Sequence, residues 1–302
     1  MEAIITVVGF LGAGKTTVLK YLIENYTHKG WRPFVILNDY ENATMDAQQF
    51  TKQLGLNSIK PLTGSCICCS GINELRNTVN RIPIREKGIT LIEANGTSDA
   101  CSLMEFLGVG LHDWFLPPIQ ISVVDVKNWQ QRGEHNELEA NQIQVSSLLV
   151  LTHLENVDEN RKAQVIHELK KLNPVAKVLT MDSLDVLLLP ELVPSKNTAQ
   201  KFDHQKAHWA SCSVDLPDLP NLKCIETICL AIPKSILRVK GCTKIEGDTG
   251  FTYFERTPDG NVHSRPFKGI PITGSKLLSI GPGSEPAVLK NAIKESLVKE
   301  VS

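Results

Sequence analysis

Near the N-terminus stands the stretch Ile4-Ile5-Thr6-Val7-Val8-Gly9-Phe10-Leu11-Gly12-Ala13-Gly14-Lys15-Thr16-Thr17. Its first five residues are apolar or β-branched, which predicts a buried strand, and the pattern that follows predicts a helix over residues 15–25. Gly9 and Gly14, separated by four residues and followed by Lys15 and Thr16, match the pattern of a phosphate-binding P-loop. The stretch therefore predicts a strand, a phosphate-binding loop and a helix in succession.

The residue types of this loop suit a nucleoside triphosphate with Mg²⁺. The Gly-Ala-Gly backbone of residues 12–14 can curl so that amide N–H groups and the helix dipole face a phosphate. Lys15 is expected to reach the β and γ oxygens and the Thr16 hydroxyl to ligate Mg²⁺, with Thr17 beside them in the nucleotide site. A glycine-rich turn without a ligand is the alternative, and the presence of both Lys15 and Thr16 argues against it.

The N-terminal half alternates apolar, β-branched runs with amphipathic stretches, which is typical of a parallel sheet covered by helices. We predict a doubly wound, mostly parallel α/β domain of the P-loop NTPase class over residues 1–189, followed by a proline-containing polar linker over residues 190–206. The expected strands are 4–8, 33–38, 89–93, 119–124, 147–151 and 176–180, and the expected helices are 15–25, 72–81, 137–144 and 159–172.

Residues 207–302 have a different pattern, and a chain of 302 residues exceeds what one hydrophobic core usually spans. We predict a small α+β domain with an antiparallel sheet and two helices on one of its faces. The expected strands are 209–214, 235–244, 251–256 and 276–279, and the expected helices are 222–231 and 286–298.

The overall composition argues against several classes of protein. Hydrophobic residues make up 42% of the chain and charged residues 22%, which is ordinary for globular proteins, and no segment approaches the ~20 apolar residues that cross a bilayer. The formal net charge of -1 and the dispersed Lys and Arg argue against a nucleic-acid partner. The chain enters its first apolar run without a signal-peptide pattern, so we expect a cytoplasmic protein with no membrane partner.

Three of the eight cysteines form the cluster Cys66-Ile67-Cys68-Cys69. Alternate residues of an extended loop project to the same side, so Cys66 and Cys68 could chelate one soft ion, with Cys69 as a third ligand where the chain turns. Thiolates select Zn²⁺ or Cu⁺ over Mg²⁺, but inert or redox-active thiols are an alternative for the cluster taken alone. The other five cysteines match no common metal spacing and are expected to be small buried hydrophobes.

Together, the P-loop and this cluster make the chain similar to the CobW-like metallochaperone GTPases, a SIMIBI-class family that includes HypB-type and UreG-type proteins. Glu93-Ala94-Asn95-Gly96-Thr97-Ser98-Asp99 resembles the E-x-x-G segment of that family, and Val123-Val124-Asp125 resembles its central strand ending in aspartate. Residues 237–281 resemble its small C-terminal domain. The resemblance implies binding of GTP and Mg²⁺, hydrolysis of GTP, and transfer of a divalent metal, most often zinc, to a client protein.

The same resemblance implies roles for individual residues. Glu93 is the expected residue for positioning water or Mg²⁺, and the amide of Gly96 is expected to sense the γ-phosphate. Asp39, in Asn38-Asp39-Tyr40-Glu41-Asn42, occupies the place of an acidic segment that serves nucleotide and metal in the family, so Lys15, Glu93 and Asp39 are the catalytic candidates. A capping carboxylate is the alternative for Glu93, and a solvated loop is the alternative for Asp39. His112 is a further candidate metal ligand, with a surface or capping role as its alternative.

One departure from the family concerns the nucleotide base. Relatives carry N-K-x-D or T-K-x-D after the fifth strand, where this chain has Thr152-His153-Leu154-Glu155. The carboxylate expected to pair with guanine is one methylene longer at Glu155, and His153 replaces a lysine. Guanine preference is therefore either weakened or restored by a small loop shift. We expect Thr152, His153 and Glu155 to contact the base, and we place GTP ahead of ATP.

Three functions stay open at this point. The first is a GTP-hydrolysing metallochaperone with a client metalloprotein as its partner. The second is a metal-responsive nucleotide-binding interaction protein with weak or altered NTPase activity. The third is a P-loop kinase acting on a small substrate, which would leave the cysteine cluster without a role. A homo-oligomer is possible for each of them.

Overall fold

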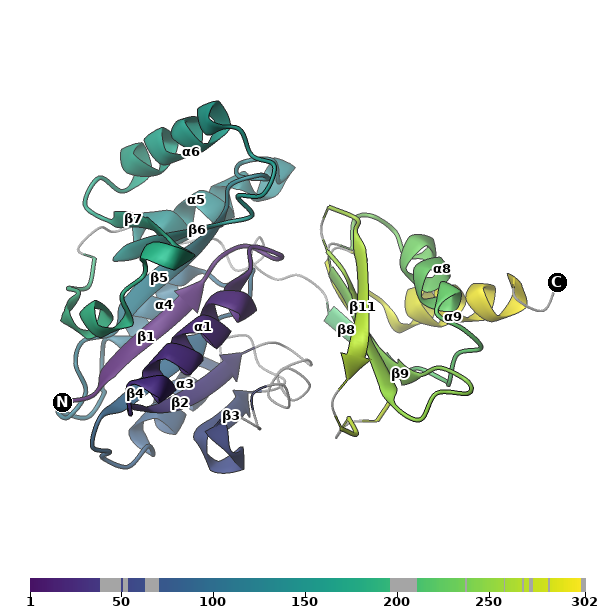
Figure 1. Cartoon of the computed structure of the whole chain (residues 1–302), viewed down its shortest axis with the longest axis horizontal. Coiled ribbons are helices and arrows are strands. Elements are labelled where there is room, and N and C mark those ends of the chain that lie inside the picture. The colour runs from purple at the N-terminus through teal and green to yellow at the C-terminus, as the bar shows by residue number, and fades with distance from the viewer. Residues whose placement is uncertain are drawn as a thin grey trace. The chain divides into compact units, whose positions relative to one another are not determined.

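The computed structural model describes residues 1–38, 50, 54–62, 71–195, 211–236, 238–257, 259–267, 269–271, 274–281 and 283–299. These residues divide into two compact units, one that ends at residue 195 and one that begins at residue 211. Each unit has its own sheet and its own core (Figure 1). The predicted fold class is thus confirmed, while the domain boundaries at residues 189 and 207 stay a prediction.

The described part of the first unit contains a sheet of seven parallel strands. Its central strand β1 pairs with β4 on one side and with β5 on the other, with Val7 opposite Glu93 and Val8 opposite Ser122. The loop after β1 therefore lies at the carboxyl edge of the sheet, where ligands bind in open α/β folds. The strands are β1 (Ala3–Val8), β2 (Arg32–Asn38), β3 (Ile59–Leu62), β4 (Gly88–Glu93), β5 (Ile119–Asp125), β6 (Leu148–Thr152) and β7 (Lys177–Thr180), in the spatial order β3-β2-β4-β1-β5-β6-β7.

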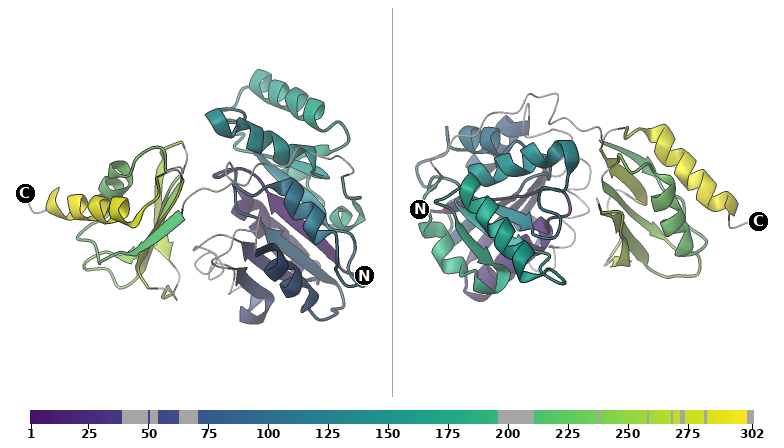
Figure 2. Two further views of the ribbon diagram at one scale, coloured as in Figure 1. Left: turned by 180° about the vertical axis from the view of Figure 1, so that it is seen from behind. Right: turned by 90° about the horizontal axis from the view of Figure 1, so that it is seen from above.

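Helices cover both faces of this sheet (Figures 1 and 2). On one face, α1 (Lys15–His28) packs beside the 3₁₀ helix η4 (Val186–Glu191), and the Tyr26 hydroxyl donates to the carbonyl of Val186 at 2.6 Å. The helices of the other face bury alternate strand residues such as Ile4 and Val124, as expected of a sheet covered on both sides. They follow one another in chain order: α3 (Gly71–Asn80), α4 (Ala100–Leu107), α5 (Asn136–Gln144) and α6 (Glu159–Leu172).

The second unit is an antiparallel sheet with both of its described helices on one face (Figure 1). Val239, Phe254 and Leu277 of the sheet pack against apolar residues of the two helices. Gly241 leaves the room that Phe254 needs, because a Cβ there would lie only 2.2 Å from the ring. The elements are β8 (Ser211–Asp215), α8 (Lys223–Ala231), β9 (Arg238–Lys244), β10 (Phe251–Arg256), β11 (Val262–Phe267), β12 (Lys276–Ile280) and α9 (Pro286–Lys299), with the strand order β11-β10-β9-β12-β8.

Among the described strands and α-helices, β3, α4 and β11 were absent from the sequence prediction. β3 contains Lys60 and Pro61 and lies at an edge of its sheet, where a residue without an N–H is tolerated. β11 is also an edge strand, and most of its side chains are exposed. α4 has only 8 residues, fewer than the roughly 11 to 18 over which helical periodicity is recognised in a sequence. Nowhere in the described chain is a helix both long and apolar enough for a membrane span.

Candidate nucleotide-binding site

The P-loop joins β1 to α1 at the carboxyl edge of the sheet. Gly12 and Gly14 have φ angles of 80° and 90°, in the region that favours glycine. Gly14 is the N-cap residue of α1, and no side chain caps the first turn of this helix. The first amide groups of α1 thus lack a side-chain acceptor, which suits an anion at this position.

Lys15 and Thr16 lie as a nucleotide triphosphate site requires. The Lys15 side chain is buried, and its Nζ donates to the carbonyl oxygens of Gly9 at 2.9 Å and Phe10 at 3.2 Å. The Thr16 hydroxyl donates to Oε1 of Glu93 at 2.9 Å. A hydroxyl beside a carboxylate at the start of α1 is an oxygen donor set of the kind that Mg²⁺ prefers, so the residues fit the expected metal.

Gly96 brings the loop after β4 against the P-loop. A Cβ at Gly96 would lie 2.8 Å from the backbone nitrogen of Leu11 and 3.0 Å from its Cα, so only glycine fits there. Gln142 of α5 holds this loop in place, because its Nε2 donates to the carbonyls of Gly96 at 3.2 Å and Ser98 at 3.3 Å. The structure therefore brings Gly96 and Glu93 to the P-loop, as a γ-phosphate sensor and a magnesium-side carboxylate would require.

A pocket of about 530 Å³ opens beside the P-loop. Thr152 and His153 tie its wall to the loop: the Thr152 hydroxyl donates to the carbonyl of Ala13 at 2.8 Å, and His153 Nε2 lies 2.9 Å from the carbonyl of Gly12. His153 reaches that carbonyl from a left-handed backbone conformation with φ 52°. The residues that line the pocket are Gly14, Thr17, Leu151, Thr152, His153, Leu154, Glu155, Thr180, Met181 and Asp182. The base contacts expected at Thr152, His153 and Glu155 thus share one cavity with the phosphate loop.

The segment Thr180-Met181-Asp182 is the part of this pocket that the sequence analysis missed. It follows β7 directly, and its 3₁₀ helix η3 (Met181–Ser183) begins with a capping box in which Thr180 and Ser183 bond each other. One signal could have revealed it, because the carboxyl ends of all parallel strands meet at one edge, including that of the last predicted strand.

Several predicted site residues lie outside the described ones. Asp39 falls in residues 39–49, and Cys66, Cys68 and Cys69 fall in residues 63–70, so their roles stay predictions. Among the described residues, no group of three or more His, Cys, Asp or Glu side chains could hold a metal ion. His112 is described, and its ring stacks on that of Trp114 with centroids 4.2 Å apart.

The five remaining cysteines are buried, as predicted. Burial raises the pKa of the thiols of Cys229 and Cys242 to about 12 each. Such thiols stay protonated at neutral pH, whereas a metal ligand must be a thiolate. This leaves the cluster at residues 66–69 as the part of the chain with cysteine spacing suited to a metal.

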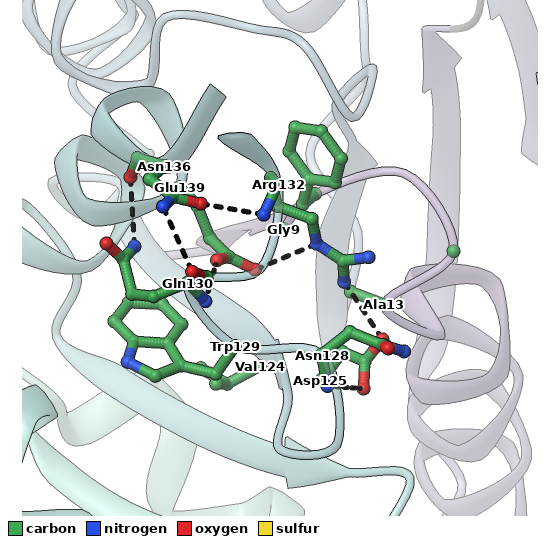
Figure 3. Close-up of polar contacts among 12 residues, drawn as sticks. Gly9, Ala13, Val124, Asp125, Asn128, Trp129, Gln130, Arg132, Asn136 and Glu139 are labelled. Atoms are coloured by element: carbon green, nitrogen blue, oxygen red, sulfur yellow. Dashed lines mark hydrogen bonds and ion pairs between the residues drawn. The ribbon is translucent and has the colours of Figure 1, made fainter. Parts of the chain in front are cut away.

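A buried charge cluster borders the P-loop on the side of β5 (Figure 3). The Arg132 guanidinium lies between two carboxylates, 2.9 Å from Asp125 Oδ2 and 3.6 Å from Glu139 Oε1, and the three side chains are only 7%, 5% and 5% exposed. Glu139 also accepts a hydrogen bond from the backbone N–H of Gln130 at 2.9 Å. Desolvation by burial nevertheless raises the pKa of Glu139 to about 6, against the opposing charge of Arg132.

This shift predicts a pH-dependent stability. A carboxyl whose pKa is raised to about 6 on folding stabilises the folded protein below its unfolded value of 4.5, and it loses that contribution as the pH rises through about 6. Wild type should therefore gain about 1 kcal/mol of unfolding free energy relative to Glu139→Gln between about pH 7.5 and pH 5. Urea unfolding at both pH values checks this. The exposed Glu137→Gln on the same helix is the control, and a wild-type difference no larger than that of the control would contradict the assignment.

Comparisons with known proteins identify the family of this chain. Residues 3–180 match the family described as CobW/HypB/UreG, nucleotide-binding domain. The chain is 27% identical over 277 residues to the zinc chaperone YjiA of Escherichia coli, with 84% of this chain and 85% of that protein covered. It is 25% identical over 289 residues to the zinc chaperone CobW of Pseudomonas aeruginosa, with 80% and 76% covered. The crystal structure of Zn(II)-bound YjiA GTPase from E. coli aligns with 97% of this chain and 98% of that chain, at 17% identity and a TM-score of 0.45. The match to the nucleotide-binding domain covers more than half of the 302 residues of this chain, so the chain belongs to the CobW/HypB/UreG family.

Proposed function

We propose that this protein is a GTP-hydrolysing metallochaperone that binds a divalent metal, zinc, at Cys66, Cys68 and Cys69 and delivers it to a client protein. One observation supports nucleotide binding above all: the phosphate loop and the segment expected to contact the base line the same pocket. Gly14 and Thr17 on one side and the segment that contains Glu155 on the other enclose a volume of about 530 Å³. A cavity of that size, lined by both apolar and polar side chains, suits a small ligand with an anionic end and a flat, polar ring.

The residues of the P-loop would divide the work of hydrolysis. With its three N–H groups, Lys15 would keep the carbonyl of Phe10 and exchange that of Gly9 for the β and γ oxygens, and Thr16 would turn from Glu93 to Mg²⁺. Glu93 would then hold Mg²⁺ through water or orient the attacking water. Bound Mg²⁺ would neutralise charge on the phosphates. Gly96 would offer its amide to the γ-phosphate, so the loop after β4 would respond to the presence of that group.

The metal part of the proposal rests on the cysteine cluster and on the relatives. Two relatives, YjiA of E. coli and CobW of P. aeruginosa, are zinc chaperones. Three cysteines within four residues supply soft ligands for Zn²⁺, and the five buried cysteines do not compete for that role. We propose that the nucleotide state controls metal affinity through the loops that contain Asp39 and Gly96, since both follow strands that end at the P-loop edge.

Steady-state phosphate release with and without one equivalent of zinc tests the proposed activity. We expect GTP hydrolysis that requires Mg²⁺ and changes with zinc. The rival favoured by the altered Thr152-His153-Leu154-Glu155 segment is a metal-responsive nucleotide-binding interaction protein. That rival predicts zinc-dependent nucleotide binding with no turnover above background, and such a result would replace the metallochaperone GTPase with the rival.

Base selectivity depends on the carboxylate at Glu155. Glu155→Asp restores the shorter side chain that relatives carry, so we expect the affinity for GTP relative to ATP to rise roughly tenfold, the value of one charge-assisted hydrogen bond. Competition titrations with fluorescent GTP and ATP analogues measure this ratio. Glu159→Asp makes the same substitution at an exposed residue outside the pocket and is the matched control. An unchanged ratio in Glu155→Asp would show that this carboxylate does not pair with guanine.

A further inference from the structure

An aromatic side chain of the P-loop itself, that of Phe10, packs against an arginine outside the loop. Phe10 is 1% exposed, and its ring centroid lies 4.9 Å from the Arg132 guanidinium carbon, within the range of a cation–π contact. The carbonyl of the same residue accepts hydrogen bonds from Lys15 Nζ at 3.2 Å and from the Ala13 N–H at 3.1 Å. Phe10 thus contacts Arg132 through its ring and the phosphate-binding lysine through its carbonyl.

Arg132 is itself held by groups from two elements. Asp125, the last residue of β5, accepts from its Nη2 at 2.9 Å, and Glu139 of α5 lies on its other side (Figure 3). Asp125 is in turn fixed by Asn128, whose backbone N–H and side-chain amide donate to it at 3.1 Å and 2.9 Å. The backbone N–H of Arg132 donates to Asn136 Oδ1 at 2.7 Å, so the guanidinium approaches Phe10 from a well-fixed position.

Such a cluster is a poor means of stabilising the fold. Removing three charged groups from water costs several kcal/mol per ion, and well-packed apolar residues of similar volume are often as stable or more stable. A guanidinium, unlike an apolar side chain, is planar and directional, and it can stack on a ring while it binds a carboxylate. Charged residues at this place beside the P-loop therefore indicate that the position and orientation of neighbouring groups matter more here than stability does.

We propose that Arg132 is a positioning residue for the triphosphate. It orders Phe10 and, through the Phe10 carbonyl, sets where Lys15 meets the β and γ oxygens. Arg132 acts through Phe10 and touches no phosphate in this role. This inference rests on the proposed nucleotide function and deepens it, because it assigns part of the discrimination between triphosphate and monophosphate to a residue outside the P-loop.

The test is the ratio of the dissociation constants for GMP and GTP, measured with fluorescent analogues and Mg²⁺. In Arg132→Met we expect GTP binding to weaken about tenfold, while GMP binding stays within about twofold, so the ratio falls about tenfold. Arg132→Lys keeps the charge but loses the planar stack, and it should recover part of the ratio. A merely structural role would weaken both nucleotides together.

Two further variants make the result decisive. Arg161→Met removes an arginine that bonds the same turn, through the carbonyl of Trp129 at 2.6 Å, and it should leave the ratio at the wild-type value. Phe10→Leu removes the ring under the guanidinium and should lower the ratio as Arg132→Met does. It provides the test if Arg132→Met folds poorly. An unchanged ratio in a folded Arg132→Met or in Phe10→Leu would overturn the positioning role and leave the proposed function intact. Wild type that binds no nucleotide would instead overturn the proposed function and, with it, this inference.

Discussion

Replacement of Lys15 by alanine should abolish GTP hydrolysis and weaken GTP binding roughly 100- to 1000-fold. The expected loss of about 3 to 4 kcal/mol corresponds to a charged donor that no longer reaches two phosphates in a buried site. Lys15 is suited to this effect because its ammonium group is already held inside the loop by the carbonyls of Gly9 and Phe10. Titration with a fluorescent GTP analogue and a phosphate-release assay measure the two quantities.

The controls for this prediction separate binding from folding. Lys15→Met keeps most of the volume of the buried side chain and should lose GTP to the same extent, whereas Lys29→Ala, at an exposed residue after α1, should bind like wild type. Circular dichroism verifies that each variant is folded. GTP affinity within about threefold of wild type in a folded Lys15→Ala would mean that Gly9 to Thr16 is not the phosphate site.

Loss of the three clustered cysteines should abolish zinc binding and spare the nucleotide. The triple variant Cys66→Ala, Cys68→Ala, Cys69→Ala lacks every thiolate of the proposed site, so stoichiometric zinc should fall to background. Because thiols with a reference pKa of ~8.5 must lose their protons to bind the metal, zinc affinity of the wild type should rise with pH. Metal analysis after equilibrium dialysis measures zinc, and GTP titration should stay within about threefold of wild type.

A buried cysteine serves as the matched control for the zinc experiment. Cys224 is fully buried in the core of the second unit, and Cys224→Ala should keep wild-type zinc occupancy. Full zinc occupancy in the triple variant would remove the cluster from the proposal. Zinc loss in Cys224→Ala as well would point instead to a general effect of cysteine removal on the fold.

Local patterns predicted most of the fold correctly. The apolar runs that became β1, β2, β4, β5 and β6 are largely buried strands, and the run at residues 176–180 became β7, an edge strand that is at most half-buried. The amphipathic stretches between the strands became helices with similar bounds. The misses were the edge strands β3 and β11 and the apolar helix α4. Edge strands are often short or polar because one side meets solvent, and a helix of 8 residues is too short for its periodicity to stand out.

Some residues of the candidate site could be assigned from the sequence, and others needed the structure. Gly14, Lys15 and Thr16 could be assigned because the residues that form a P-loop are neighbours in the sequence and follow a known pattern. The sequence assigned Thr16 and Glu93, 77 residues apart, separate roles near Mg²⁺, and the structure added the hydrogen bond between them. The position of Asp182 after the last parallel strand could have suggested that it lies near the pocket, but only the structure showed that this residue lines it, since the loop after β7 has no residue motif for a ligand.

The sequence by itself determined the P-loop, the cysteine cluster, the order of strands and helices and the resemblance to the CobW/HypB/UreG family, because each of these depends on short-range spacing and periodicity. Only the tertiary structure decided that Asp125, Arg132 and Glu139 form one buried cluster against Phe10, and that burial raises the pKa of Glu139 to about 6. The physical reason is that an ion pair and a desolvation energy depend on distances and on excluded water. The packing of α5 on the sheet sets these distances and excludes the water, however far apart the residues lie along the chain.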